Sequence, residues 1–210
     1  MSDADGHEYI DFMGEFTAGP YGHSDPQFAA AIRSALNDGL NFGKTLPLAE
    51  LAGLIKARFS SMELMRFTNS GTEANLLALA LLIFDEVMTS RLSPGGIQGR
   101  TGITPDLTTL GKNIGGGMSA GVFGGLGAIM GRFDPRRADA LPHAGTFNNN
   151  ALTMAAGAVG LRDIFTPDAA KALNTRGDRL RPSVLRLTED TRWRLKAHCG
   201  PYLFARNQGA

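Results

Sequence analysis

Residues 64–80, LMRFTNSGTEANLLALA, place a strand pattern directly before a helix start. The run LMRFT at 64–68 predicts a short strand. Ser70 is followed three residues later by Glu73, and this capping-box spacing predicts that a helix begins there. Since a strand that passes directly into a helix is typical of α/β proteins, we expect an α/β fold.

The start of this helix offers the donors of a phosphate site. Its first backbone N–H groups have no acceptor within the helix and point outward. Gly71 lets the backbone approach an anion closely, and the hydroxyls of Ser70 and Thr72 add two donors. These features favour a phosphate cup at the carboxyl edge of a sheet. The alternative is a capped helix that binds no ligand.

The composition describes an ordinary globular chain whose partner is a small molecule. Its 210 residues are 43% hydrophobic and 20% charged, and 21 basic residues nearly balance 20 acidic ones. A formal net charge of +1 gives no electrostatic case for nucleic acid or for an anionic membrane. No apolar stretch is long enough to span a bilayer. The single Cys199 and the acidic, polar residues 1–10 predict a cytoplasmic protein without a disulfide framework.

Two further helices are expected before this strand. Ser24 or Asp25 can cap the first, and Gly39 lies just past its end. Its apolar face carries Phe28, Ile32 and Leu36. The second helix begins near Pro47, and its apolar face carries Leu48, Leu51, Ile55 and Phe59.

Residues 81–88, LLIFDEVM, predict a second strand that ends in acids. Four consecutive apolar residues followed by two acids indicate a buried parallel strand, which would deliver Asp85 at its carboxyl end. By strand alternation, Val87 would lie on the same side as Asp85. The alternative is that Asp85 and Glu86 form a solvated strand end.

Residues 109–117, TLGKNIGGG, place Lys112 between glycines. Many of the chain's 27 glycines cluster at 111–131, where the backbone must turn tightly or approach something closely. The fragment LGKN superficially resembles the phosphate loop of nucleotide-binding α/β proteins. That alternative fails, because Asp106 stands where a glycine is required and Asn113 replaces the Ser or Thr.

Three separate segments thus offer an anion cup, a carboxylate at a strand end and a lysine in a glycine-rich loop. These are the three contacts that pyridoxal phosphate requires. Its phosphate needs the cup, its ring nitrogen needs an acid, and its aldehyde needs an amine to form a Schiff base. The sequence therefore points to this cofactor.

Several long motifs occur in one order along the chain. They are YIDFMGEFTAGPYGHSDPQFAAAIRSAL, FTNSGTEANLLALAL, LLIFDEVMTSR, PDLTTLGKNIGGGMSAGVFGG and HAGTFNNNALTMAAG. Together they resemble class III aminotransferases, most of all the glutamate-1-semialdehyde aminomutase branch, over most of residues 8–181. The resemblance implies a fold type I pyridoxal-phosphate transferase, with three layers around a mainly parallel sheet, truncated in this chain.

The resemblance also implies a role for each site residue. Lys112 would form the Schiff base with pyridoxal 5'-phosphate, Asp85 would pair with the pyridinium nitrogen, and Val87 would pack on the ring face. The phosphate would be held by Ser70, Gly71 and Thr72. The implied reaction is a transamination, or an aminomutase reaction, of a small amino acid or amino aldehyde.

Subunit and domain organisation follow from the same resemblance. Thr146 in HAGTF matches the threonine that reaches the neighbouring subunit's cofactor phosphate in this family, which implies a homodimer. The expected divisions are an N-terminal segment at 1–45, a shortened cofactor domain at 46–165 and a partial C-terminal domain at 166–210.

The chain departs from the family at one internal point. LALA at 77–80 runs almost directly into LLIFDEV at 81–87, where the family has several further βα units. An alternative function is therefore a catalytically inactive remnant that binds the cofactor or a full-length homologue. No pair of the four histidines has metal-ligand spacing, so no metal site is expected.

Overall fold

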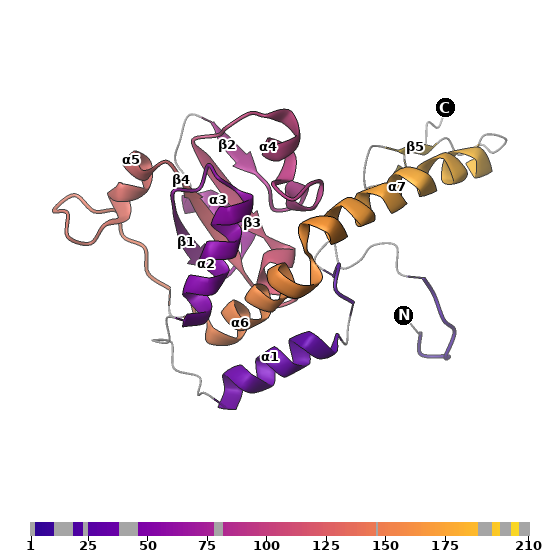
Figure 1. Cartoon of the computed structure of the whole chain (residues 1–210), viewed down its shortest axis with the longest axis horizontal. Helices are drawn as coiled ribbons and strands as arrows, with labels where there is room; N and C mark the ends of the chain where they lie inside the picture. The colour runs from indigo at the N-terminus through magenta and orange to yellow at the C-terminus, as the bar shows by residue number, and fades with distance from the viewer. Residues whose placement is uncertain are drawn as a thin grey trace.

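A computed structural model gives the fold of the chain (Figure 1). It describes residues 3–10, 19–22, 25–37, 46–77, 82–145, 147–188, 195–197 and 203–205, and the structural statements that follow concern these residues. Ser24, Gly39, Thr146 and Cys199 lie outside the described residues, so what the sequence predicts of them stays a prediction.

Four strands form one sheet in the order β1-β4-β3-β2. They are β1 (Leu64–Thr68), β2 (Ile83–Asp85), β3 (Leu107–Gly111) and β4 (Gly121–Gly125). β2 lies parallel to β3, whereas β4 lies antiparallel to both of its neighbours, β1 and β3. Three strands therefore run in one direction, and their carboxyl ends lie at the same edge of the sheet. The predicted strand at 64–68 is confirmed.

One face of the sheet packs against helices in the larger hydrophobic core. The helices are α2 (Leu46–Arg58) and α6 (Ala151–Val159), and α1 (Pro26–Asn37) packs on α6. Core residues on this face include Leu51, Ile55, Leu110, Val122 and Met154. Both helices predicted before β1 are confirmed. The Asp25 carboxylate caps α1, because its Oδ1 accepts a hydrogen bond from the backbone N–H of Gln27 at 2.8 Å.

The opposite face carries α3 (Gly71–Leu77) and α5 (Gly127–Met130). Its smaller core contains Ala74, Leu107, Phe123, Met130 and Phe133. The neighbouring residues Val122 and Phe123 of β4 thus belong to different cores, as the alternation of side chains along a strand requires. The sheet lies between two apolar layers, which is the three-layer arrangement that the sequence predicts.

The remaining elements are short turns and a long helix. The turns are η2 (Thr89–Arg91), α4 (Gly96–Thr101), η3 (Lys112–Gly115), η4 (Gly131–Phe133) and η5 (Gly160–Ile164). α7 (Pro167–Thr188) continues through Pro182 and leads away from the sheet in Figure 1, and β5 (Leu195–Ala197) pairs with β6 (Leu203–Ala205). No helix in the described ranges is long and apolar enough to cross a membrane. The predicted domain limits stay predictions.

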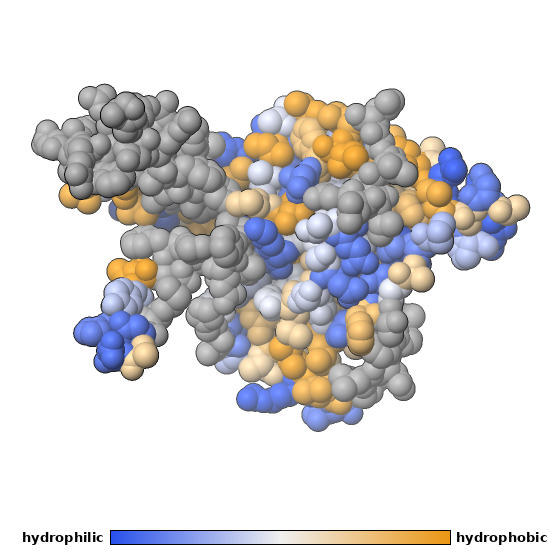
Figure 2. All heavy atoms as spheres, turned by 180° about the vertical axis from the view of Figure 1, so that it is seen from behind, coloured by the Kyte–Doolittle hydropathy of each residue, from blue (hydrophilic) through white to orange (hydrophobic). Residues whose placement is uncertain are grey.

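β2 is less buried than the sequence predicts. Leu82 is 41% exposed and Ile83 is 37% exposed. In the described sheet, β2 has β3 on one side and no strand on the other, so its outer side keeps contact with solvent. Figure 2, seen from behind, shows apolar residues along the upper part of the molecule, the end where Figure 1 places β2. The prediction of a buried strand is therefore wrong, because β2 lies at an edge of the described sheet.

Candidate active site

The predicted site residues follow three strands that end at one edge of the sheet. Thr68, Asp85 and Gly111 are the last residues of β1, β2 and β3, and all three strands run in the same direction. In the register between β2 and β3, Asp85 lies opposite Thr109, three residues before Lys112. The topology therefore brings the three predicted segments to one place.

Two glycines allow these segments to touch. A β-carbon added to Gly111 would lie 3.2 Å from the Cα of Gly71, which begins α3. A β-carbon added to Gly71 would lie 2.7 Å from Cγ2 of Val87. The segments that end β1, β2 and β3 are thus in direct contact, and larger residues at Gly71 or Gly111 would force them apart.

The start of α3 is capped by side chains on both sides. The backbone N–H of Glu73 donates to Oγ of Ser70 at 3.1 Å, as the capping box predicts. The Glu73 carboxylate accepts from the N–H of Asn69 at 2.8 Å, one residue earlier than a standard capping box would place it. The N–H groups of Gly71 and Thr72 come too early in the helix to have an intrahelical acceptor, which leaves them suited to an anion.

Lys112 leaves the end of β3 in an uncommon backbone conformation. Its φ is 55°, in the left-handed region that few residues other than glycine adopt. Partial burial lowers the pKa of the Lys112 amine, the positive charge of Arg91 lowers it further, and the carboxylate of Asp85 opposes both effects. Asp85 and Arg91 therefore act electrostatically on the amine that the sequence predicts to be reactive.

Asp85 is exposed, because it ends the edge strand β2. Its Oδ1 accepts a hydrogen bond from the N–H of Val87 at 2.9 Å. This bond fixes the turn after β2, in which Val87 lies against Gly71. The sequence predicts Asp85 and Val87 on one side of a strand, but β2 ends at Asp85, so a turn and not strand alternation positions Val87.

Glu86 is a buried acid, which excludes for this residue the alternative of a solvated strand end. Its side chain is 0% exposed, and its carboxylate accepts backbone hydrogen bonds from Ile97 and Gln98 at the start of α4, each at 2.9 Å. Gly96 leaves room for this carboxylate, since a β-carbon there would lie 2.6 Å from Oε1. The one available signal was the glycine pair at 95–96, which follows the two acids after a loop of suitable length.

Thr146 lies outside the described residues, but the loop that contains it can be placed. Asn69, which precedes Ser70, donates from Nδ2 to Oδ1 of Asn148 at 2.8 Å. Asn150 then caps α6 by accepting from the N–H of Leu152 at 2.9 Å. The residues on the carboxyl side of Thr146 therefore lie beside the predicted phosphate cup of the same chain.

Two other features attract attention but lie apart from this site. A pocket of about 360 Å³ is lined by residues of α2 and β1, together with His143 and Asn149, and contains neither Lys112 nor Asp85.

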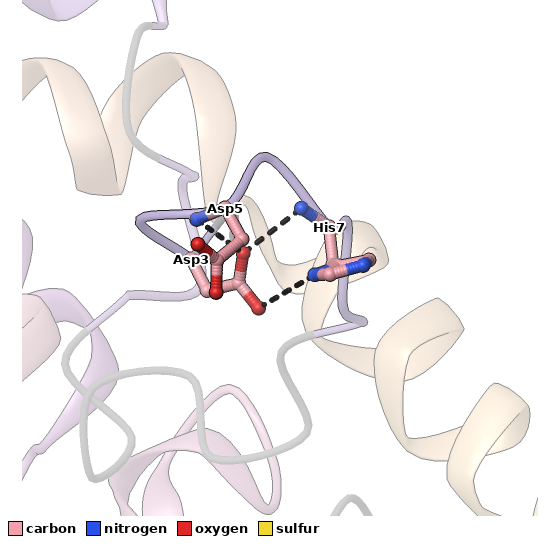
Figure 3. Close-up of side chains that lie close together, drawn as sticks. All are labelled: Asp3, Asp5 and His7. Carbon is pink, nitrogen blue, oxygen red and sulfur yellow. Dashed lines mark hydrogen bonds and ion pairs between the residues drawn. The ribbon is translucent and has the colours of Figure 1, made fainter.

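Near the N-terminus, the side chains of the exposed Asp3, Asp5 and His7 lie close together, with one oxygen or nitrogen atom of each within 4.8 Å of the others (Figure 3). Hydrogen bonds account for this cluster, because Asp3 accepts from the backbone N–H groups of Asp5 and His7.

The fold is that of the fold type I pyridoxal-phosphate transferases, and a lysine, an acid and a glycine-lined helix start lie where three strands end at one sheet edge. The profile of the family "Aminotransferase class-III" matches residues 1–81 and 79–195, and the chain belongs to that family. The family uses pyridoxal 5'-phosphate. The contacts at Gly71 and Gly111 fit such a group, because they hold the start of α3, whose first N–H groups have no intrahelical acceptor, against the segments that end β2 and β3.

Three known proteins illustrate the relationship. The β-phenylalanine transaminase of Variovorax paradoxus is 39% identical over 274 residues, which cover 85% of this chain and 63% of that protein. Its solved structure matches with a TM-score of 0.92, at 37% identity, over 98% of this chain and 70% of the other. The glutamate-1-semialdehyde 2,1-aminomutase of Bordetella avium is 30% identical over 89% of this chain and 68% of its own length. A transaminase with PLP bound has a TM-score of 0.85 at 24% identity, over 95% of this chain and 73% of that one, and shares the fold.

Proposed function

We propose that the chain acts as a pyridoxal-phosphate-dependent transaminase or aminomutase on a small amino acid or amino aldehyde, with Lys112 as the residue that bonds the cofactor. The observation that carries the proposal is the contact between the segments of Gly71, Val87 and Gly111, which brings the helix start next to the lysine. When bound, the cofactor supplies an aldehyde that reacts with amines and a ring that accepts electrons.

The residues of this chain divide the work by their chemistry. The N–H groups and hydroxyls at Ser70, Gly71 and Thr72 would bind the phosphate. The carboxylate of Asp85 would face the ring nitrogen, and Val87 would contact the ring. Once an amino substrate has replaced Lys112 at the cofactor, the freed Lys112 Nζ would remove the proton from the substrate's α-carbon. A lowered pKa suits this step, because more of the Lys112 amine is neutral at a given pH.

Assembly and location form part of the same proposal. Thr146 would reach the phosphate held by a second copy, so that two chains complete each other's sites as a homodimer. The match of Thr146 in HAGTF to the family's threonine supports this. The lone cysteine of the sequence supports a reducing, cytoplasmic location.

The exposed edge supports a second candidate function. The family profile divides at residues 79–81, directly before β2, and the chain spans 63% of the length of the Variovorax relative. A chain that lacks the segments beside Asp85 could bind the cofactor or a full-length homologue without turnover. The two candidates agree on Lys112 and differ in whether the substrate's proton is ever removed.

The test is a covalent label on the lysine. Addition of pyridoxal phosphate should give a visible absorbance band, and borohydride should fix the cofactor on the peptide that contains Lys112. Lys112→Ala should abolish the adduct, whereas the matched control Lys171→Ala, on the exposed surface of α7, should leave it unchanged. Adducts scattered over Lys44, Lys56 and Lys171 without preference for Lys112 would overturn the proposal. Turnover of amino substrates by the labelled site separates the enzyme from the remnant.

A further inference from the structure

Lys112 is followed by a hydrogen-bonded group of residues, Asn113 with Ser90 and Tyr21, which we call the Asn113 support. The next residue, Asn113, is 1% exposed, and it is tied to two distant segments. Oγ of Ser90 donates to Oδ1 of Asn113 at 3.2 Å, and the hydroxyl of Tyr21 donates to the backbone carbonyl of Asn113 at 2.8 Å. Side chains 23 and 92 residues away in the sequence therefore meet at the residue after the lysine.

Both donors are themselves held in place. Ser90 is 3% exposed in η2, and its own N–H donates to the carbonyl of Glu86 at 3.0 Å. The Tyr21 ring packs edge-to-face on Phe28, with ring centroids 4.7 Å apart, and also contacts Phe165. Burial raises the pKa of the Tyr21 hydroxyl, so this group stays a hydrogen-bond donor at any physiological pH.

The Asn113 support can stabilise the strained backbone of Lys112. A non-glycine residue with a positive φ is strained and persists only where the surroundings hold it. Lys112, at φ 55°, satisfies this description, and the two hydrogen bonds to Asn113 are the contacts that fix the backbone on its carboxyl side. The N–H of Gly116 donates a third hydrogen bond to Asn113, the second to its backbone carbonyl, at 3.2 Å and closes the turn.

We propose that Asn113, held by Ser90 and Tyr21, is the positioning residue that keeps Lys112 in its left-handed conformation and directs its amine to the site. This role rests on the proposed function for its purpose, but the geometry is present in the chain without cofactor. The same turn that carries Ser90 also carries Arg91, whose charge acts on the amine together with that of Asp85. Loss of either hydrogen bond should let the Lys112 side chain move toward water.

The test measures the amine itself. Competitive acetylation from about pH 7 to about pH 11, analysed by peptide mass spectrometry, gives the titration midpoint of each lysine. Ser90→Ala and Tyr21→Phe should raise the Lys112 midpoint toward the ordinary lysine value and thus lower the neutral fraction of this amine at pH 8, relative to the wild-type chain. The matched controls Ser93→Ala and Tyr9→Phe each remove a hydroxyl that bonds elsewhere, to Gly96 and to Asp3, and should leave the midpoint unchanged.

A wild-type Lys112 midpoint in either folded variant, Ser90→Ala or Tyr21→Phe, would overturn the positioning role. Because acetylation is done without cofactor, the two proposals fail separately. A shifted midpoint together with scattered borohydride adducts sinks the proposed function alone. A specific adduct on Lys112 together with unshifted midpoints sinks the positioning role alone.

Discussion

β3 and β2 are neighbouring parallel strands, and Lys112 follows the first while Asp85 ends the second, yet their surroundings differ. Every residue of β3 is buried between β4 and β2, and Lys112 follows it onto the Asn113 support. β2 is a three-residue edge strand with exposed ends, and Asp85 is exposed with it. The lysine side of the candidate site, β3 with Lys112 and Asn113, is therefore built into the buried part of the fold. The aspartate side, β2 with Asp85, lies at the exposed edge of the described sheet.

This difference locates what the chain lacks relative to its family. The family profile divides at residues 79–81, immediately before β2. The alignment with the Variovorax transaminase runs over 274 positions, so at least 64 of them have no counterpart among the 210 residues of this chain. The division of the profile lies next to Asp85 in the sequence, on the side of the site where β2 has no further strand in the described sheet.

The largest loss of stability is expected where the backbone of β4 packs directly against the backbone of Ser70. A β-carbon added at Gly121 of β4 would lie 2.0 Å from the carbonyl oxygen of Ser70. Gly121→Ala should therefore reduce the free energy of unfolding by about 4 kcal/mol or more, since neither backbone can yield cheaply. Gly53→Ala in α2 is the matched control, because that position is open. Urea denaturation should show it unchanged or stabilised by up to about 1 kcal/mol; equal losses for both variants would refute the close packing.

Removal of apolar side chains from the two neighbouring strands should give unequal losses. Leu110 of β3 is fully buried, so Leu110→Ala should cost about 3 kcal/mol of unfolding free energy. Ile83→Ala on β2 should cost less than about 1 kcal/mol, because a substantial part of that side chain already contacts water. Urea denaturation of both variants checks the difference. An Ile83→Ala loss as large as that of Leu110→Ala would mean that β2 is covered.

The adjacent acids Asp85 and Glu86 should separate chemistry from stability. Glu86→Gln should cost about 2 kcal/mol of unfolding free energy, because a neutral amide replaces a buried carboxylate that accepts two backbone hydrogen bonds. Asp85→Asn should change stability little and still permit the borohydride adduct, while any transamination slows greatly. Denaturation and single-turnover kinetics on both variants distinguish these roles. The reverse pattern would exchange the two assignments.

The smallest effect concerns His143, beyond the opposite edge of the sheet. Burial lowers the pKa of the His143 ring, the charge of Arg66 lowers it further, and Glu73 partly opposes them. The folded chain thus binds a proton there less readily than the unfolded chain. This contribution to stability is present above the ordinary histidine pKa of about 6.5 and is lost as the pH falls through the folded value. His143→Gln should make the fall in stability between about pH 7.5 and about pH 5 shallower; an unchanged or steeper fall would contradict the sign.

Sequence reasoning succeeded where one local signal determines the outcome. The capped start of α3 at Ser70, the two early helices and the strand at 64–68 follow from patterns a few residues long. The grouping of Ser70, Asp85 and Lys112 at one edge followed from their order on an α/β fold. The roles of these residues, and that of Thr146, stay predictions.

The errors arise where distant segments decide. Whether β2 is buried depends on which strands flank it, and four apolar letters carry no information on that. Glu86 is buried because a loop returns the start of α4 to it, and Asn113 is held by Tyr21 from 92 residues away. No pattern around Asn113 indicates its partner, and for Glu86 the glycine pair at 95–96 is the one signal, because these contacts exist only in the folded chain.

Hydrogen–deuterium exchange of the chain without cofactor tests the central claim most directly, that the lysine side is built and the aspartate side is not. Amides in residues 107–113 lie on a strand paired on both sides, followed by the turn tied to Ser90 and Tyr21. Those in residues 82–88 belong to an edge strand and to the turn after it, and of these residues only Glu86 is buried. The account predicts markedly slower exchange in peptides from 107–113 than in peptides from 82–88. Equal exchange, or slower exchange in 82–88, would contradict it.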